Sequence, residues 1–135
     1  MSLKEEDSRV LVTLELEKVG KTLAEMEIQM KNALWSLAAN RLYYALFHAV
    51  SALLIIDRHE VGTHRGAVNM FSLYYVKTGL FSIAEGKLYS NLQKLREDGD
   101  YNCSIDVEQS DVEGKVAPAC QLIDKIKQYV ATKMA

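Results

Sequence analysis

The sequence contains little of what builds disulfide-rich, linker-rich or strongly basic proteins. It has one proline and seven glycines among 135 residues, and no repeat or low-complexity tract interrupts it. Its two cysteines, Cys103 and Cys120, match no zinc-binding spacing and are too few for a disulfide framework. Sixteen basic residues stand against 18 acidic ones, for a net charge of −2. Any binding of phosphate or RNA must therefore come from a local cluster of cations.

Long uncharged runs are absent as well. The runs at residues 42–47 and 49–56 flank His48, and each is shorter than the stretch of about 20 apolar residues that a membrane span needs. We interpret this region as a buried core helix and expect no membrane association. The sequence opens on a charged segment rather than an apolar signal peptide, which predicts a cytoplasmic protein.

Apolar residues recur at helical spacing and nowhere alternate convincingly with a period of two. We therefore predict a single all-α domain over residues 1–135, built as an up-and-down bundle of four to five helices. The first helix is expected from about residue 7 or 8 to residue 30, with its apolar stripe at Leu16, Val19, Leu23, Met26 and Met30. The second, apolar nearly all round, should be central and run from an N-cap at Asn32 to about residue 57.

Capping signals place the other three helices. The third is predicted to open after Thr63 and to end at residues 77–79. The fourth should begin at the Ser82–Glu85 capping box and end before Gly99. A similar pattern, Ser110–Glu113, predicts the start of the last helix, which runs to about residue 130 and which Pro118 should kink or delay. Residues 101–109 are then a connecting loop.

Arg41 and His48 form the one constellation that points to chemistry. They lie seven residues apart, two helical turns, so both project from nearly the same line of the second helix. The small residues Ala38, Ala45 and Ala52 fall on that line and predict a trough, with Tyr44 and Ser51 along one edge.

A guanidinium and an imidazole in one groove suffice for metal-free RNA cleavage. Histidine can move protons at the attacking 2′-hydroxyl or the leaving oxygen, and arginine can stabilise the charge that builds on phosphorus. The structural alternative is equally simple: alanines let another helix approach closely, Arg41 pairs with an acid, and His48 is a satisfied core histidine.

The run Asn40-Arg41-Leu42-Tyr43-Tyr44-Ala45-Leu46-Phe47-His48-Ala49, followed by Ser51-Ala52-Leu53-Leu54, resembles the central helix of the HEPN superfamily. More narrowly, it is similar to the small stand-alone HEPN proteins encoded beside minimal nucleotidyltransferases. The similarity continues through Thr63-His64-Arg65-Gly66, Phe71, residues 76–79, Arg96 and Asp100-Tyr101, and so spans roughly residues 8–130.

The resemblance implies a helical bundle, usually dimeric, in which two Arg–His faces meet in a cleft. In many HEPN proteins an arginine and a histidine separated by four to six residues form the active site of a metal-independent ribonuclease, and six residues separate Arg41 from His48. It also implies a toxin role with a nucleotidyltransferase antitoxin as partner. Two positions depart from the pattern: Leu42 replaces the polar residue common after the arginine, and Val50 replaces a tyrosine that such a partner modifies.

Further polar residues extend the candidate site. Asp100, with Tyr101 beside it, is expected from its family position to reach Arg41, although a helix-end turn explains the pair as well. Arg96 is another candidate for phosphate binding, and interaction with the dipole of a helix end is its structural alternative. The cations and histidines between the second and third helices offer either a phosphate-binding rim or a solvated loop: Arg58, His59, His64 and Arg65.

Three functional hypotheses follow. The first is a homodimeric ribonuclease toxin with Arg41 and His48 as catalytic residues and Tyr44, Ser51, His64, Arg96, Asp100 and Tyr101 in substrate or phosphate binding. The second is a non-catalytic subunit that binds a nucleotide or the nucleotidyltransferase. The third is a helical oligomerisation protein. No cofactor or metal is expected, since His59 and His64 lack a convincing third ligand.

Overall fold

The computed structural model describes residues 3–60 and 62–135, and within them it contains helices and no strand. Five are α-helices, and a π-helical segment, η1 (Ser72–Val76), continues the third of them. Their bounds are α1 (Leu3–Lys31), α2 (Trp35–Ile56), α3 (His64–Phe71), α4 (Ile83–Tyr101) and α5 (Gln109–Met134). This confirms the all-α prediction.

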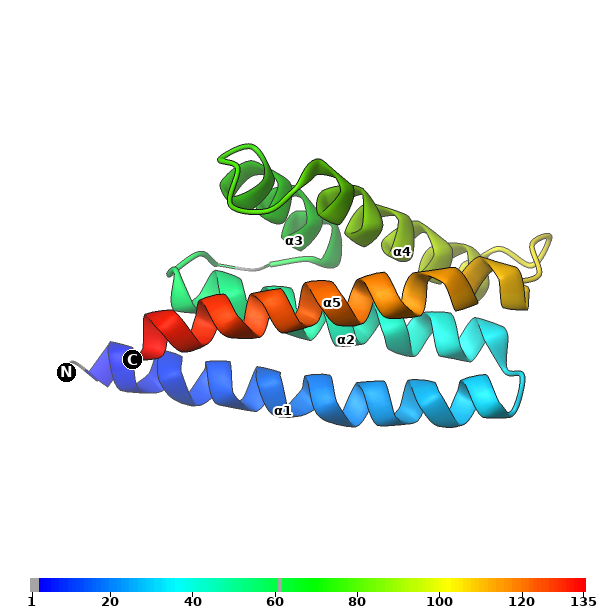
Figure 1. The fold of residues 1–135 in the computed structure, drawn as a ribbon, viewed down its shortest axis with the longest axis horizontal. Coiled ribbons are helices and arrows are strands. Elements are labelled where there is room, and N and C mark those ends of the chain that lie inside the picture. The colour runs from blue at the N-terminus through cyan, green and yellow to red at the C-terminus, as the bar shows by residue number, and fades with distance from the viewer. Residues whose placement is uncertain (1–2, 61) are drawn as a thin grey trace.

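The long helices alternate in direction, as in an up-and-down bundle (Figure 1). α1, α2 and α5 run side by side, α3 and α4 cover the other side of α2, and the two ends of the chain lie at the same end of the bundle. α2 packs against α1, α3, α4 and α5, which confirms its predicted central position.

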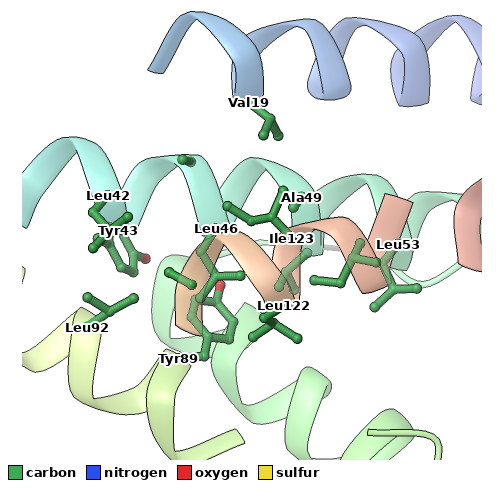
Figure 2. Close-up of a cluster of buried hydrophobic side chains, with 14 of the residues drawn as sticks. Val19, Leu42, Tyr43, Leu46, Ala49, Leu53, Tyr89, Leu92, Leu122 and Ile123 are labelled. Atoms are coloured by element: carbon green, nitrogen blue, oxygen red, sulfur yellow. The ribbon is translucent and has the colours of Figure 1, made fainter. Parts of the chain in front are cut away.

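The core forms where α2 meets α4 and α5 (Figure 2). Among its fully or almost fully buried aliphatic side chains are Leu42, Leu46, Leu53, Leu92, Leu122 and Ile123. Each such side chain contributes about 1.5–3 kcal/mol relative to an exposed one. α2 is also long and apolar enough to cross a membrane by length and composition alone, but 61% of its apolar window is buried inside the bundle, as in the core helix of a soluble protein.

The turn between α1 and α2 differs from the predicted one. α1 begins earlier than expected and continues to Lys31, and Asn32 does not cap α2 because its side-chain amide donates back to the Ile28 carbonyl of α1. Ala33 takes a left-handed conformation with φ 56°, and Leu34 precedes α2 without a side-chain cap. The prediction that Asn32 caps α2 is wrong, because both its side-chain amide and its backbone N–H donate to the Ile28 carbonyl of α1.

Two capping predictions are confirmed at the start of α3 and α4. The Thr63 hydroxyl accepts the backbone N–H of Gly66, and Ser82 and Glu85 form both bonds of a capping box. Gly79, with φ 83°, occupies the left-handed position that ends the α3–η1 unit.

The boundaries of α4 and α5 correct the predictions. α4 continues through Gly99 to Tyr101, and the Ser36 hydroxyl donates to the Gly99 carbonyl. A β-carbon at Gly99 would come within 2.9 Å of the Ser36 hydroxyl oxygen, so the glycine serves close helix packing rather than termination. α5 begins at a capping box of Glu108 and Asp111 instead of Ser110 and Glu113, and it contains Pro118 within its length.

A closed polar cluster lies at the C-terminal end of α2. Asp57 Oδ2 accepts hydrogen bonds from the hydroxyls of Tyr75 (2.7 Å) and Tyr129 (2.8 Å), and Lys133 Nζ lies 3.8 Å from Asp57 Oδ1. Burial, then the bond to Asp57, raises the pKa of Tyr129 to about 12, and the same causes raise that of Tyr75. We call Asp57, Tyr75, Tyr129 and Lys133 the Asp57 cluster; it ties α2 to η1 and α5.

Candidate functional site

One face of α2 remains partly open between α1 and the α3–α4 side of the bundle. Arg41, Tyr44 and His48 project from it at helical spacing, each partly exposed. The Arg41 guanidinium carbon lies 5.2 Å from the centre of the Tyr44 ring, and the His48 ring centre lies 6.3 Å from it on the following turn. The two groups singled out from the sequence therefore flank one tyrosine; we call this the Arg41–His48 face.

The predicted trough of small residues is not open. Ala38, Ala45 and Ala52 are fully buried, so no ligand can reach them. Small side chains let two helix backbones approach closely, and α1 packs along the length of α2. For the alanines the structural alternative is the correct one, and the open part of the face is set by Tyr44 instead.

Arg41 is held in place by neighbouring polar groups. Its Nε and Nη2 donate to Asn40 Oδ1 at 3.0 and 2.7 Å, and its Nη1 lies 3.6 Å from Glu25 Oε1 on α1. Asn40 Nδ2 donates in turn to Asp100 Oδ2 at 2.9 Å. Asp100 therefore reaches Arg41 as expected, but through Asn40 rather than directly.

Arg96 lies beneath the same face, with only 7% of its side chain exposed. It occupies the interior of α4, so the helix-end interpretation is wrong. Its guanidinium carbon lies 4.9–5.7 Å from the ring centres of Tyr43, Tyr44 and Tyr101. Its Nη1 donates to the Tyr101 hydroxyl at 3.4 Å and lies 3.9 Å from Asp100, whereas its Nε is buried without a partner in the described part of the chain. Tyr44 thus lies between two guanidinium groups, an arrangement that attracts anions.

His48 makes a short hydrogen bond to α1. Its Nδ1 lies 2.7 Å from Glu15 Oε2, and 17% of the histidine side chain is exposed. Since a carboxylate only accepts, Nδ1 carries a hydrogen and donates it. In the neutral ring Nε2 is then unprotonated and can accept a proton from a ligand.

His64, the first residue of α3, joins the face from the opposite side. Its ring centre lies 5.4 Å from that of Tyr44 and 4.4 Å from that of Phe47, and its Nδ1 lies 3.1 Å from the Tyr43 hydroxyl. Burial, followed by the charges of Arg96 and His48, lowers the pKa of His64, and burial raises that of Tyr43 to about 12. A neutral His64 that accepts from Tyr43 presents its Nε2–H as a donor.

Ser51 lies one turn beyond His48, away from Arg41. It is 5% exposed and lines an open hollow of about 780 Å³ between the start of α1 and the end of α2, together with Glu15 and Phe47. The hollow borders the Arg41–His48 face at Glu15. Ser51 therefore lies beside the face rather than along the edge shared with Tyr44.

The polar loop after α2 does not assemble into one rim. Arg58 pairs with Glu5, and His59 stacks on Tyr74 with 3.9 Å between ring centres. Arg65 is exposed. Of the four residues considered, only His64 contacts the Arg41–His48 face.

The sequence interpretation missed Asn40, Glu15 and Glu25. Asn40 directly precedes Arg41, and an amide beside a guanidinium was an available signal. The two glutamates were not recognisable, because their importance depends on how α1 pairs with α2. Together these residues hold a guanidinium beside an aromatic ring and an imidazole whose Nε2, in the neutral ring, can take a proton; such groups can act on a phosphate ester.

Comparison with known proteins places the chain in a family. A profile of the HEPN domain matches residues 14–129. The UPF0332 protein of Thermotoga maritima is 32% identical over 108 residues, covering 80% of this chain and 82% of its own length. Two Methanocaldococcus jannaschii proteins, named as candidate toxins, are 29% and 26% identical over 127 and 118 residues, covering 94% and 87% of this chain and 94% and 80% of their own lengths. The chain belongs to the HEPN family.

Proposed function

We propose that this protein is a metal-independent ribonuclease of toxin–antitoxin type, in which the Arg41–His48 face binds and cleaves RNA. The observation that carries the proposal is the placement of Arg41 and His48 on either side of Tyr44, with His48 Nδ1 bonded to Glu15 so that, in the neutral ring, the hydrogen lies on Nδ1 and Nε2 can take a proton. The toxin names of two relatives support the biological role.

The reaction is an attack of the RNA 2′-hydroxyl on the adjacent phosphorus. The bond between the 2′-oxygen and phosphorus forms, the bond to the 5′-oxygen breaks, and the products are a 2′,3′-cyclic phosphate and a 5′-hydroxyl. His48 takes the proton from the 2′-hydroxyl or returns one to the leaving oxygen. In a homodimer whose faces meet, one copy of His48 performs each step. Arg41 stabilises the additional charge on the phosphoryl oxygens.

The leucine after Arg41 does not remove the polar support of the arginine. Leu42 is fully buried in the core, so this position cannot contribute a group to the face. Asn40, on the other side of Arg41, supplies the polar contact. Val50 is also fully buried, which argues against modification of this position by a partner.

Exposed apolar residues around the face support association with a second protein surface. Leu37 (51% exposed) and Tyr101 (76%) lie near the Arg41 end, and Leu11 (51%) and Leu14 (48%) lie on α1 near the other end. Apolar residues around a polar site are typical of an interface that encloses it. We assign these four apolar residues to the interface of the homodimer, and we expect the nucleotidyltransferase antitoxin to bind the assembled dimer.

The test is expression of wild type, Arg41→Ala and His48→Ala, with growth arrest and RNA integrity as readouts. Wild type is expected to arrest growth and degrade RNA. His48→Ala should reduce cleavage by the purified protein by about 10²–10⁴-fold and Arg41→Ala by about 10²–10³-fold, because each removes one group that acts on the transition state.

His59→Ala is the matched control. His59 contacts Tyr74 and Tyr75 rather than the face, so this variant should remain as active as wild type. Circular dichroism and thermal unfolding are used to check that each variant folds. Equal activity of wild type and His48→Ala would contradict the proposal.

A non-catalytic binding subunit is the second candidate function. The observation behind it is that Asn40 accepts from two Arg41 nitrogens, which holds the guanidinium in place for an anion without requiring any reaction. This function predicts that purified protein binds ATP or RNA, that Arg41→Ala weakens the binding, and that RNA remains intact.

A further inference from the structure

α1 contributes a series of carboxylates to the groove that it forms with α2. Three acid–base pairs follow the antiparallel course of the two helices: Glu25 with Arg41, Glu15 with His48, and Glu5 with Arg58 just beyond α2. The two outer pairs have longer N–O distances, 3.6 and 3.2 Å, and more exposed side chains than the middle pair. Exposed ion pairs of this kind contribute about 0–1 kcal/mol and do not fix a side chain.

The middle pair differs in both distance and exposure. Glu15 Oε2 and His48 Nδ1 are 2.7 Å apart, and only 23% and 17% of the two side chains are exposed. A short bond to a charged acceptor, partly shielded from water, is about twice as strong as a neutral one. The remaining ring contacts of His48 are with Tyr44 and Phe47, so Glu15 is its one hydrogen-bond partner in the described part of the chain.

We propose that Glu15 is the positioning residue for His48. Its carboxylate accepts the Nδ1–H, holds the neutral imidazole in that tautomer, and keeps the bare Nε2 directed away from α1 toward the substrate. This inference rests on the proposed ribonuclease for its catalytic consequence, but the tautomer itself is a property of the free protein.

A neutral imidazole needs such a partner because nothing else fixes which of its two ring nitrogens carries the hydrogen. The hydrogen can reside on either ring nitrogen, and the ring can rotate to exchange their positions. An Nε2–H form cannot act as a base at Nε2. A carboxylate that bonds Nδ1–H removes both freedoms, and the loss of such a supporting group commonly costs 10–100-fold in function.

The experiment compares wild type with Glu15→Ala, Glu15→Gln and the control Glu5→Gln in the full chain. Nitrogen-15 NMR of the histidine ring, above the pH at which it titrates, reports the tautomer without any substrate. We expect wild type and Glu5→Gln to show His48 as Nδ1–H, and Glu15→Ala to show a mixture in which the Nε2–H form appears. Glu15→Gln keeps an oxygen acceptor but adds a competing donor, so it should lie between them.

Kinetics supply the second readout. Glu15→Ala should lower kcat on the order of 10–100-fold with KM changed less than about twofold, because Glu15 supports His48 and does not contact RNA. An unchanged tautomer in Glu15→Ala overturns the inference, as does a kcat equal to that of Glu5→Gln when the wild type is active. If wild type cleaves no RNA but the tautomer shifts as expected, the proposed function fails while the role of Glu15 in positioning stands.

Discussion

The Asp57 cluster and the Arg41–His48 face are two polar regions of the same helix, yet their hydrogen bonds are distributed in opposite ways. In the Asp57 cluster every polar group has a partner: two tyrosine hydroxyls and one ammonium converge on a single carboxylate. On the Arg41–His48 face, among the residues that the structure describes, the Nε of Arg96 is buried without a partner and His48 is bonded through one ring nitrogen.

The difference separates stabilising polar groups from groups available to a ligand. A closed network lowers the free energy of the folded state and has nothing left to offer a substrate. An open network leaves donors and acceptors without partners, which lowers the stability of the fold. Proteins retain such unpaired groups at functional sites. Changes in the Asp57 cluster should therefore alter stability, and changes on the face should alter activity.

The largest stability effect is expected at the closed cluster. Asp57→Ala leaves the Tyr75 hydroxyl, on a residue that is 1% exposed, without its short bond, and it removes the partner of Tyr129 as well. The free energy of unfolding should fall by about 3 kcal/mol, measured by urea denaturation. RNA cleavage at a temperature where the variant is folded should stay at the wild-type level; a variant that is stable but inactive would break the comparison.

A smaller effect, this time on activity, is expected at the open face. Asn40→Ala removes the bridge from Asp100 to Arg41 and leaves the guanidinium free to move. The rate of RNA cleavage should decrease about 10-fold, while the free energy of unfolding changes by less than about 1 kcal/mol. Asn32→Ala is the matched control, because Asn32 is exposed and its side-chain amide donates to the Ile28 carbonyl of α1, away from the face. A loss of stability as large as that of Asp57→Ala would show that the face is structural.

The Asp57 cluster should also make the stability of the protein depend on pH in the alkaline range, through the hydroxyl of Tyr129. The pKa of Tyr129 is about 12 in the folded protein, against 10.0 for an ordinary tyrosine, so the unfolded chain loses this proton first. Its stabilising contribution is complete below pH 10 and is lost as the pH rises toward 12. The stability of wild type should fall over that range, and that of Tyr129→Phe should fall less. Parallel curves for the two proteins would contradict the assignment of Tyr129 to the cluster.

Local signals predicted much of the fold. The apolar stripe of α1, the caps at Thr63 and Ser82, and the left-handed Gly79 all follow from residues close in sequence, and each is confirmed. In each of the adjacent pairs Tyr43-Tyr44 and Tyr74-Tyr75 one member lies in the core: Tyr43 and Tyr75 are buried, while Tyr44 and Tyr74 are not. Adjacent helical residues point about 100° apart, which is why this could be predicted.

The predictions that failed share a physical cause: contacts between residues far apart in the sequence override local patterns. Gly99 is typical of a helix end but lies inside α4 because Ser36 packs against it. The alanines of α2 are compatible with either an open trough or a helix contact, and only the packing of the neighbouring helices decides between them. Glu15 is one of several acids on α1 until the register of α1 against α2 brings it to His48.

The central claim is that the Arg41–His48 face cleaves RNA by proton transfer without a metal. The most direct measurement is analysis of the RNA ends produced by purified wild type and His48→Ala in the presence of a chelator. We predict 2′,3′-cyclic phosphate and 5′-hydroxyl ends from wild type and intact RNA from His48→Ala. Cleavage that the chelator abolishes, ends that carry a 5′-phosphate, or equal cleavage by both proteins would contradict it.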